Sequence, residues 1–298
     1  MPRENARQRR RRIASATGVT NFRDDFNYIC KRHPDRIGIV TEGDSWFAYP
    51  RKWIAFGADI NVVHHVEEVI QGTDTANLLR MACNGDEAIN MMSGKQKEIF
   101  EKVLIKNAPY IKLILFSGGG NDIVGKRDML ALLNTYEEGF SAQECINSQQ
   151  FENKLNAVML AFEALLELRN RHTPNAKIVV HSYDIAKPSN EGASFFWGLI
   201  KTKPWISPYL LERQIPEELH QEIVEILLGA FKDKLQAFTQ LPQYINTIFM
   251  VNTQGTLRPG HKDDWLNEIH PTESGFKKVS KLIYKKMKEI EPTLPKWT

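Results

Sequence analysis

The sequence is poor in cysteine and in long apolar runs, and both shortages narrow its class. Three cysteines among 298 residues are too few for a disulfide framework or for a paired C-x-x-C zinc site. No apolar run reaches the length of about 18 residues that a transmembrane helix needs. The basic start leads into Ile13-Ala14-Ser15 rather than into the apolar stretch of a secretory signal. We therefore expect a protein of the reducing cytoplasm, with reduced thiols at Cys30, Cys83 and Cys145.

The net positive charge of the chain comes from its first residues. The net charge is +3, but residues 1–12 hold six arginines and one glutamate, a balance of +5 that leaves −2 for the other 286 residues. We interpret residues 1–20 as a basic, disordered arm, because terminal blocks of like charge usually stay solvated. Contact of Arg7–Arg12 with nucleic acid or an anionic membrane surface is the weaker alternative, and no nucleic-acid partner is expected.

The remaining residues, 21–298, have the composition of a folded domain, with 42% hydrophobic and 25% charged residues in the whole chain. Short β-branched runs predict five strands, and apolar stripes at helical spacing predict helices between them. This alternation predicts a three-layer α/β sandwich around a parallel sheet. The predicted strands are residues 36–41, 59–64, 111–116, 176–181 and 247–251, and the clearest helices are residues 151–171, 217–238 and 272–289.

Residues 185–216 interrupt the alternation with four prolines and five aromatic residues. A segment of this kind is typical of a capping insertion or a lid. A satellite core that covers one end of the sheet is the plainer interpretation, and the two are compatible. The residues in question are Pro188, Phe195, Phe196, Trp197, Pro204, Trp205, Pro208, Tyr209 and Pro216.

Small and polar residues follow three of the predicted strands. They are Gly43-Asp44-Ser45, Gly120-Asn121-Asp122 and His181-Ser182-Tyr183-Asp184. Ligands bind outside the carboxyl ends of the strands in open α/β sheets, so we expect a site at this edge.

Ser45 is the candidate nucleophile of that site. A serine hydroxyl needs a base that takes its proton and donors that hold the resulting oxyanion. His270 follows the last predicted strand and is the natural base. Gly85 offers an unobstructed backbone N–H, and the side chain of Asn121 offers an amide donor.

These residues stand in four blocks that resemble those of the SGNH hydrolases, also called GDSL esterases and lipases. The blocks are Gly43-Asp44-Ser45-Trp46, Gly85, Gly119-Gly120-Asn121-Asp122 and Asn267-Glu268-Ile269-His270-Pro271. The resemblance spans residues 37 to about 289. It implies a flavodoxin-like fold with five parallel strands in the order 2-1-3-4-5, and the hydrolysis of a carboxylic ester without a metal or cofactor.

The same resemblance implies a role for each residue. Ser45 would be the nucleophile and His270 the base, and the N–H groups of Ser45 and Gly85 would form the oxyanion hole with Asn121. Further candidates for contact with the substrate are Trp46, Asp122, Trp197 and Trp205. A non-catalytic binding module on the same fold is the alternative function, and the acyl and alcohol parts of a substrate are left open.

The chain departs from the family at one position. Asn267 stands where the family usually has an aspartate, three residues before the histidine. An amide oxygen can orient the ring of His270 but cannot stabilise an imidazolium by charge. Three interpretations follow: Asn267 acts alone, Asp264 supplies the charge, or Glu268 does so, although its side chain is expected to point away.

Two competing motifs are set aside. Residues 120–126 match most of a phosphate-binding loop, but Arg127 follows where a Ser or Thr would hold Mg²⁺. His64-His65 suggests a metal, but neighbours on the strand predicted there would point to opposite faces.

Overall fold

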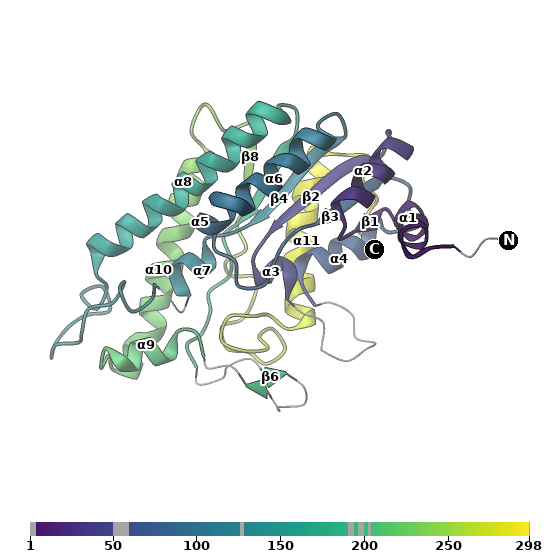
Figure 1. The fold of residues 1–298 in the computed structure, drawn as a ribbon. Helices are drawn as coiled ribbons and strands as arrows, with labels where there is room; N and C mark the ends of the chain where they lie inside the picture. Colours follow the sequence, from purple (N-terminus) through teal and green to yellow (C-terminus); the bar gives the residue numbers. More distant parts are fainter. Residues whose placement is uncertain are drawn as a thin grey trace.

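A parallel sheet of six strands forms the middle layer of the protein, in the order β1-β3-β2-β4-β5-β8 (Figure 1). We describe a computed structural model that covers residues 4–49, 60–125, 128–189, 194–195, 200–201 and 204–297. The strands along the sheet are β1 (Val19–Thr20), β3 (Ala76–Arg80), β2 (Ile37–Gly43), β4 (Ile111–Ser117), β5 (Lys177–His181) and β8 (Ile248–Val251).

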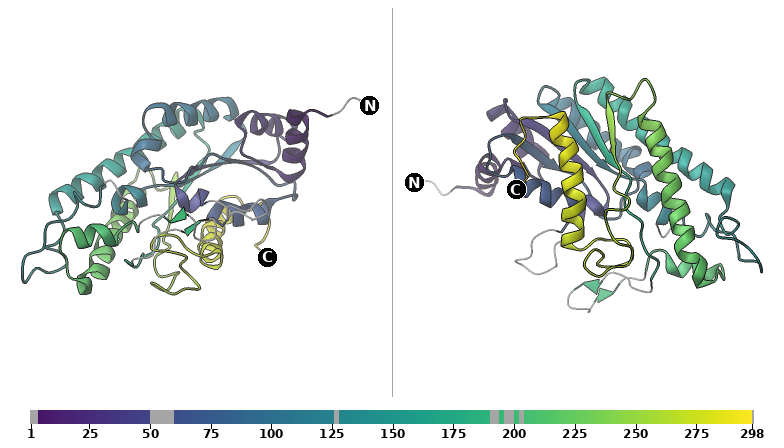
Figure 2. Two further views of the ribbon diagram at one scale, coloured as in Figure 1. Left: turned by 60° about the horizontal axis from the view of Figure 1, so that its bottom comes forward. Right: turned by 180° about the vertical axis from the view of Figure 1, so that it is seen from behind.

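Helices cover both faces of the sheet, which confirms the predicted three-layer α/β sandwich (Figure 2). On one face α6 packs against α8, and on the other α4 packs against α11. The three long predicted helices are confirmed as α8, α10 and α11. The helices are α1 (Ala6–Thr17), α2 (Arg23–Arg32), α3 (Ser45–Ala48), α4 (Val62–Ile70), α5 (Ala88–Met91), α6 (Gly94–Asn107), α7 (Gly120–Val124), α8 (Ser148–His172), α9 (Ser207–Glu212), α10 (Glu217–Thr239) and α11 (Glu273–Ile290).

The strand order 2-1-3-4-5 is confirmed for β3, β2, β4, β5 and β8, but the sheet has six strands rather than five. The additional strand, β1, pairs with β3 at the edge of the sheet, with Val19 beside Leu78. Two residues are too few to show an alternating pattern, so the sequence carries no signal for β1. None of the described helices combines the length and apolar character needed to cross a bilayer.

The strand predicted over residues 59–64 is wrong. Asp59 lies outside the described residues, and Val62–Ile70 form helix α4. The side chain of Asn61 caps this helix by accepting from the backbone N–H of His64. Val62, Val66 and Ile70 are buried along one side of it, a spacing of four that fits a helix. Strand β3, the true neighbour of β2, follows this helix.

The basic arm also differs from the expectation, because residues 6–17 form helix α1 instead of a disordered segment. Asp25 of α2, which is only 1% exposed, accepts from Nε of Arg10 at 3.1 Å and from Nε of Arg11 at 3.3 Å. The guanidinium groups also lie over the rings of Phe22 and Tyr28. The buried carboxylate of Asp25 therefore binds two of the arginines from which disorder was predicted.

The described residues of the insertion, 185–189, 194–195, 200–201 and 204–216, lie at the end of the sheet where β2 leads into α3 (Figure 1). Its described part contains α9 and a small antiparallel pair, β6 (Ser194–Phe195) and β7 (Ile200–Lys201). Phe196 and Trp197 lie outside the described residues.

Replacement of Asp25 by Asn tests how α1 is held. The amide cannot pair with two guanidinium groups, so we expect the free energy of unfolding to fall by about 1–3 kcal/mol. Urea denaturation measures it. Asp24→Asn is the matched control, because Asp24 and its partner Lys106 are exposed and the pair should contribute little. Equal stability of wild type and Asp25→Asn would contradict this account of α1.

Candidate active site

Ser45 and His270 meet at the carboxyl edge of the sheet although 225 positions separate them in sequence. Ser45 is the first residue of α3, directly after β2, and the side chain of Asp44 caps this short helix. Nε2 of His270 lies 2.8 Å from Oγ of Ser45. Both residues are only 3% exposed, so the pair is shielded from bulk water.

Asn267 orients the ring of His270. Its Oδ1 lies 3.0 Å from Nδ1 of His270 and also accepts from the backbone N–H groups of Ile269 and His270. Its Nδ2 donates to the hydroxyl of Tyr49 at 3.1 Å. Because Oδ1 is an acceptor in this network, Nδ1 of His270 carries the hydrogen. The lone pair of Nε2 then faces Ser45, which is the tautomer that a general base requires.

The surroundings of His270 favour the neutral imidazole. Burial lowers the pKa of His270 from 6.5 to about 3, because the charged ring would lose its hydration. A carboxylate at position 267 would offset that loss, but the amide of Asn267 carries no charge. The ring is therefore uncharged at neutral pH, and its Nε2 carries a lone pair. No charged side chain at position 267 stabilises the imidazolium that would form when Nε2 takes a proton.

Asp264, a candidate for the missing charge, is engaged elsewhere. Its carboxylate accepts from Nε of Arg258 at 2.8 Å and from Nζ of Lys278 at 2.5 Å. These cations hold the pKa of Asp264 well below its usual value. Asp264 thus joins the loop before it to α11, and the structure does not bring it to His270.

Glu268, the third candidate, is buried and anchors the insertion. Its carboxylate accepts from the backbone N–H groups of Ser189, Trp205, Ile206 and Ser207. Burial raises its pKa, while these donors oppose that rise. The side chain is directed away from His270, as expected, but its role in holding the insertion has no signature in the sequence.

A buried chain of hydrogen bonds lies behind Ser45. Asp44 accepts from the hydroxyl of Ser117 at 2.8 Å and from that of Tyr183, and Nε2 of His181 lies 2.9 Å from Oγ of Ser117. Nδ1 of His181 accepts from the backbone N–H of Tyr183, so its Nε2 is the donor to Ser117. The polar residues after β5 predicted a site at this edge of the sheet. They did not predict that His181 and Tyr183 would join the hydrogen bonds behind Ser45.

The three expected oxyanion donors lie around the same edge. Asn121, in α7, lines a small cavity together with Ser45, and its Nδ2 donates to the carbonyl of Asp86 at 2.9 Å. Gly85, next to Asp86, has φ +86°, a conformation that favours glycine. In the part of the chain that the structure describes, the backbone N–H groups of Ser45 and Gly85 have no protein acceptor.

Aromatic rings enclose His270. The ring centroids of Tyr49 and His270 are 4.1 Å apart, and sequence analysis missed Tyr49. Trp205 of the insertion meets the His270 ring edge-on, with 5.3 Å between the ring centroids. Trp46 is buried, and its Nε1 donates to the carbonyl of Ile269. Trp46 therefore joins the loop of Ser45 to the turn of His270. Trp197, the other expected aromatic contact, lies outside the described residues.

Asp122, expected to contact the substrate, instead holds α5. Its buried carboxylate accepts from the backbone N–H groups of Ala88 at 2.7 Å and Ile89 at 3.2 Å. Burial raises its pKa to about 6. The cavity beside Ser45 is small, about 20 Å³, and is lined among others by Trp46, Tyr183 and Leu228.

Comparisons with known proteins bear on the fold. No protein-family model matches the sequence, and no curated protein matches it. The lipase Lip_vut3 from a goat rumen metagenome is 13% identical, with a TM-score of 0.51 over 84% of this chain and 96% of that one. A Slackia heliotrinireducens protein assigned to the SGNH hydrolases is 9% identical (TM-score 0.49; 85% and 99% covered). An extracellular lipase from Streptomyces rimosus is 13% identical (TM-score 0.44; 84% and 99% covered). The likeness to Lip_vut3 shows a shared fold.

Replacement of Asn267 by Asp tests the role of the amide. A carboxylate would stabilise the imidazolium, so we expect kcat to rise on the order of 10-fold. The gain should fall short of the factor of about 10⁴ between Asp and Asn in a chymotrypsin-like triad, because Asn267 already holds the correct tautomer. The acid limb of the kcat/KM profile should lie below pH 6.5 in the wild type and move to higher pH in the variant.

Asp264→Asn is the control for that experiment. It removes a carboxylate that contacts Arg258 and Lys278, so it should lower the melting temperature and leave kcat of the folded enzyme unchanged. A large loss of kcat in folded Asp264→Asn, with no gain in Asn267→Asp, would return the catalytic charge to Asp264.

Proposed function

We propose that this chain, which has the fold of the SGNH hydrolases, is a serine hydrolase that cleaves a carboxylic ester through an acyl-enzyme at Ser45. The observation that carries the proposal is the 2.8 Å contact between Oγ of Ser45 and Nε2 of His270, with Nδ1 held by Asn267. A buried serine that faces the lone pair of a neutral imidazole is arranged for deprotonation as it attacks.

The residues around this pair supply the steps of a two-stage reaction. Oγ of Ser45 attacks the acyl carbon while Nε2 of His270 takes its proton. The N–H groups of Ser45 and Gly85 and the amide of Asn121 would hold the oxyanion. The C–O bond of the ester then breaks, and His270 returns the proton to the leaving alcohol. Water attacks the acyl-enzyme with His270 again as base, and the acid is released.

The size of the cavity favours a short acyl group. At about 20 Å³, it exceeds by little the space that one water molecule needs. Trp205 covers His270 from the insertion, and Glu268 fixes the backbone at that position. We infer an acyl group of the size of acetyl rather than a lipid chain. Cleavage in the cytoplasm stays a prediction from the cysteine content.

The non-catalytic binding module is the competing function, and the uncharged Asn267 is the observation that favours it. A binding module needs no particular tautomer at position 270, whereas the hydrogen bonds around Asn267 select the catalytic one. Labelling of the serine separates the two functions.

Replacement of Ser45 by Ala should lower kcat for p-nitrophenyl acetate by on the order of 10⁶, as loss of a serine nucleophile can do. A fluorophosphonate probe should label the wild type at Ser45, as read by mass spectrometry of peptides. Ser93→Ala, at an exposed serine, is the matched control and should keep both activity and labelling. Labelling at another serine, or full activity of Ser45→Ala, would refute the proposal.

Replacement of Trp205 by Ala tests the short acyl site. Removing the ring above His270 should raise kcat/KM for the butyrate or octanoate ester relative to the acetate by about 10-fold, a typical value of one or two methylenes in an apolar pocket. Trp297→Ala is the control, because that ring packs on Tyr284 near the C-terminus. An unchanged chain-length preference in folded Trp205→Ala would assign Trp205 to packing alone.

A further inference from the structure

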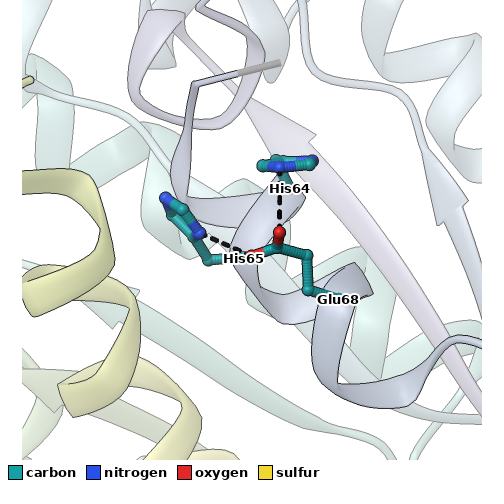
Figure 3. A group of neighbouring side chains, drawn as sticks. All are labelled: His64, His65 and Glu68. Atoms are coloured by element: carbon teal, nitrogen blue, oxygen red, sulfur yellow. Dashed lines mark hydrogen bonds and ion pairs between the residues drawn. The ribbon is translucent and has the colours of Figure 1, made fainter. Parts of the chain in front are cut away.

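Helix α4 carries a cluster of potential metal ligands, His64, His65 and Glu68, that the proposed hydrolysis does not use (Figure 3). Sequence analysis set His64-His65 aside because it placed them on a strand. On a helix their rings both reach toward Glu68, which lies one turn later (Figure 3). One ligand atom from each residue can be chosen so that all three lie within 4.8 Å of one another.

The hydrogen bonds of His65 indicate which of its ring nitrogens carries a hydrogen and which one offers a lone pair to Glu68. His65 is 2% exposed, and its Nε2 lies 3.2 Å from the backbone carbonyl of Glu273. A carbonyl oxygen only accepts, so Nε2 carries a hydrogen. In the neutral ring, Nδ1 then presents its lone pair to Oε2 of Glu68 at a distance of 2.8 Å. A lone pair and a carboxylate repel each other unless a positive species lies between them.

A divalent ion is such a species. Nε2 of His64 lies 3.5 Å from Oε1 of the same carboxylate, and the ring centroids of His64 and His65 are 5.2 Å apart. An ion between the two rings and Glu68 could bind one nitrogen of each imidazole together with a carboxylate oxygen.

We propose that His64, His65 and Glu68 form a binding site for a divalent transition-metal ion of the zinc class. Two imidazoles and one carboxylate are a donor set that Zn²⁺ accepts at bond lengths of about 2.0–2.2 Å, with water as a fourth ligand. Tetrahedral bonds of that length separate ligand atoms by about 3.3 Å. Nδ1 of His65 lies 2.8 Å from Oε2 of Glu68, and Nε2 of His64 lies 3.5 Å from Oε1. All three ligand atoms lie within 4.8 Å of one another, so the side chains would close around the ion as it binds.

The surroundings fit this assignment. Metal-binding histidines commonly donate their other N–H to a backbone carbonyl, as His65 does to Glu273. The side chain of Glu68 is 53% exposed, so an ion can reach it and the side chain can adjust. Glu273 is the first residue of α11, three positions after His270. A metal on His65 would therefore fasten α4 to the helix that follows the catalytic turn.

Metal titration of the full-length protein tests the proposal without any measurement of ester hydrolysis. After treatment with EDTA and its removal, calorimetry with ZnCl₂ should give one site per chain with a micromolar or lower Kd. Co²⁺ should give visible absorption bands of a low-coordinate site. Zinc should also raise the melting temperature. Glu68→Gln, at an exposed side chain, should weaken binding at least 10-fold and abolish the cobalt bands.

Two further variants sharpen the test. His172→Gln is the matched control, because His172 also contacts a glutamate, Glu101, at 2.7 Å, and it should leave binding unchanged. Lys277→Gln should tighten binding, because the ammonium of Lys277 attracts the Glu68 carboxylate that the ion would use. No saturable binding at about 100 μM zinc, or binding that survives Glu68→Gln in folded protein, would overturn the proposal and leave a direct contact between His65 and Glu68.

Discussion

The hydrogen bond from Nδ1 of His270 to Oδ1 of Asn267 is the interaction on which the candidate site depends. Oδ1 of Asn267 accepts from this nitrogen and from two backbone N–H groups of the same turn, so one atom sets the turn and the tautomer together. A ring in the other tautomer would present a hydrogen to Ser45 instead of a lone pair. Nε2 of His270 and Oγ of Ser45 are thus aligned by an uncharged side chain.

Burial explains how carboxylates are distributed around the site. Asp44 and Glu268 are nearly inaccessible to water, and each is held by three or more donors. An ionised carboxylate in such a place needs that many partners, because it has lost its hydration. Each of them holds backbone or buttresses Ser45, and neither reaches His270. Asn267 takes the place beside His270, and its uncharged amide is buried at a smaller desolvation cost than a carboxylate.

Sequence patterns predicted most of the sheet and singled out Ser45 and His270, which the structure places side by side, because strand periodicity and the four spaced blocks are local signals. These patterns gave a wrong prediction where the same residues are compatible with two different local structures. Ile60-Asn61-Val62-Val63 reads as a strand by its β-branched residues, but Asn61 caps a helix. The charge of Arg7–Arg12 predicts a solvated arm. However, Asp25, which is buried on another helix, accepts hydrogen bonds from Arg10 and Arg11.

The choice among Asn267, Asp264 and Glu268 was also beyond the sequence. All three lie within six residues of His270, and only the direction of each side chain separates them. Those directions are set by distant partners: Tyr49 for Asn267, and backbone N–H groups of the insertion for Glu268. Tyr49 itself has no motif, and its contact with His270 arises from the fold alone.

Nitrogen-15 NMR of the histidine rings across pH 4 to 8 tests this account most directly, with His270 assigned by the loss of its signals in His270→Gln. The account predicts a neutral ring with hydrogen on Nδ1 at pH 7 that stays neutral well below pH 6.5, because burial lowers the pKa of His270. A ring with hydrogen on Nε2, or an imidazolium already formed at pH 6.5, would contradict it.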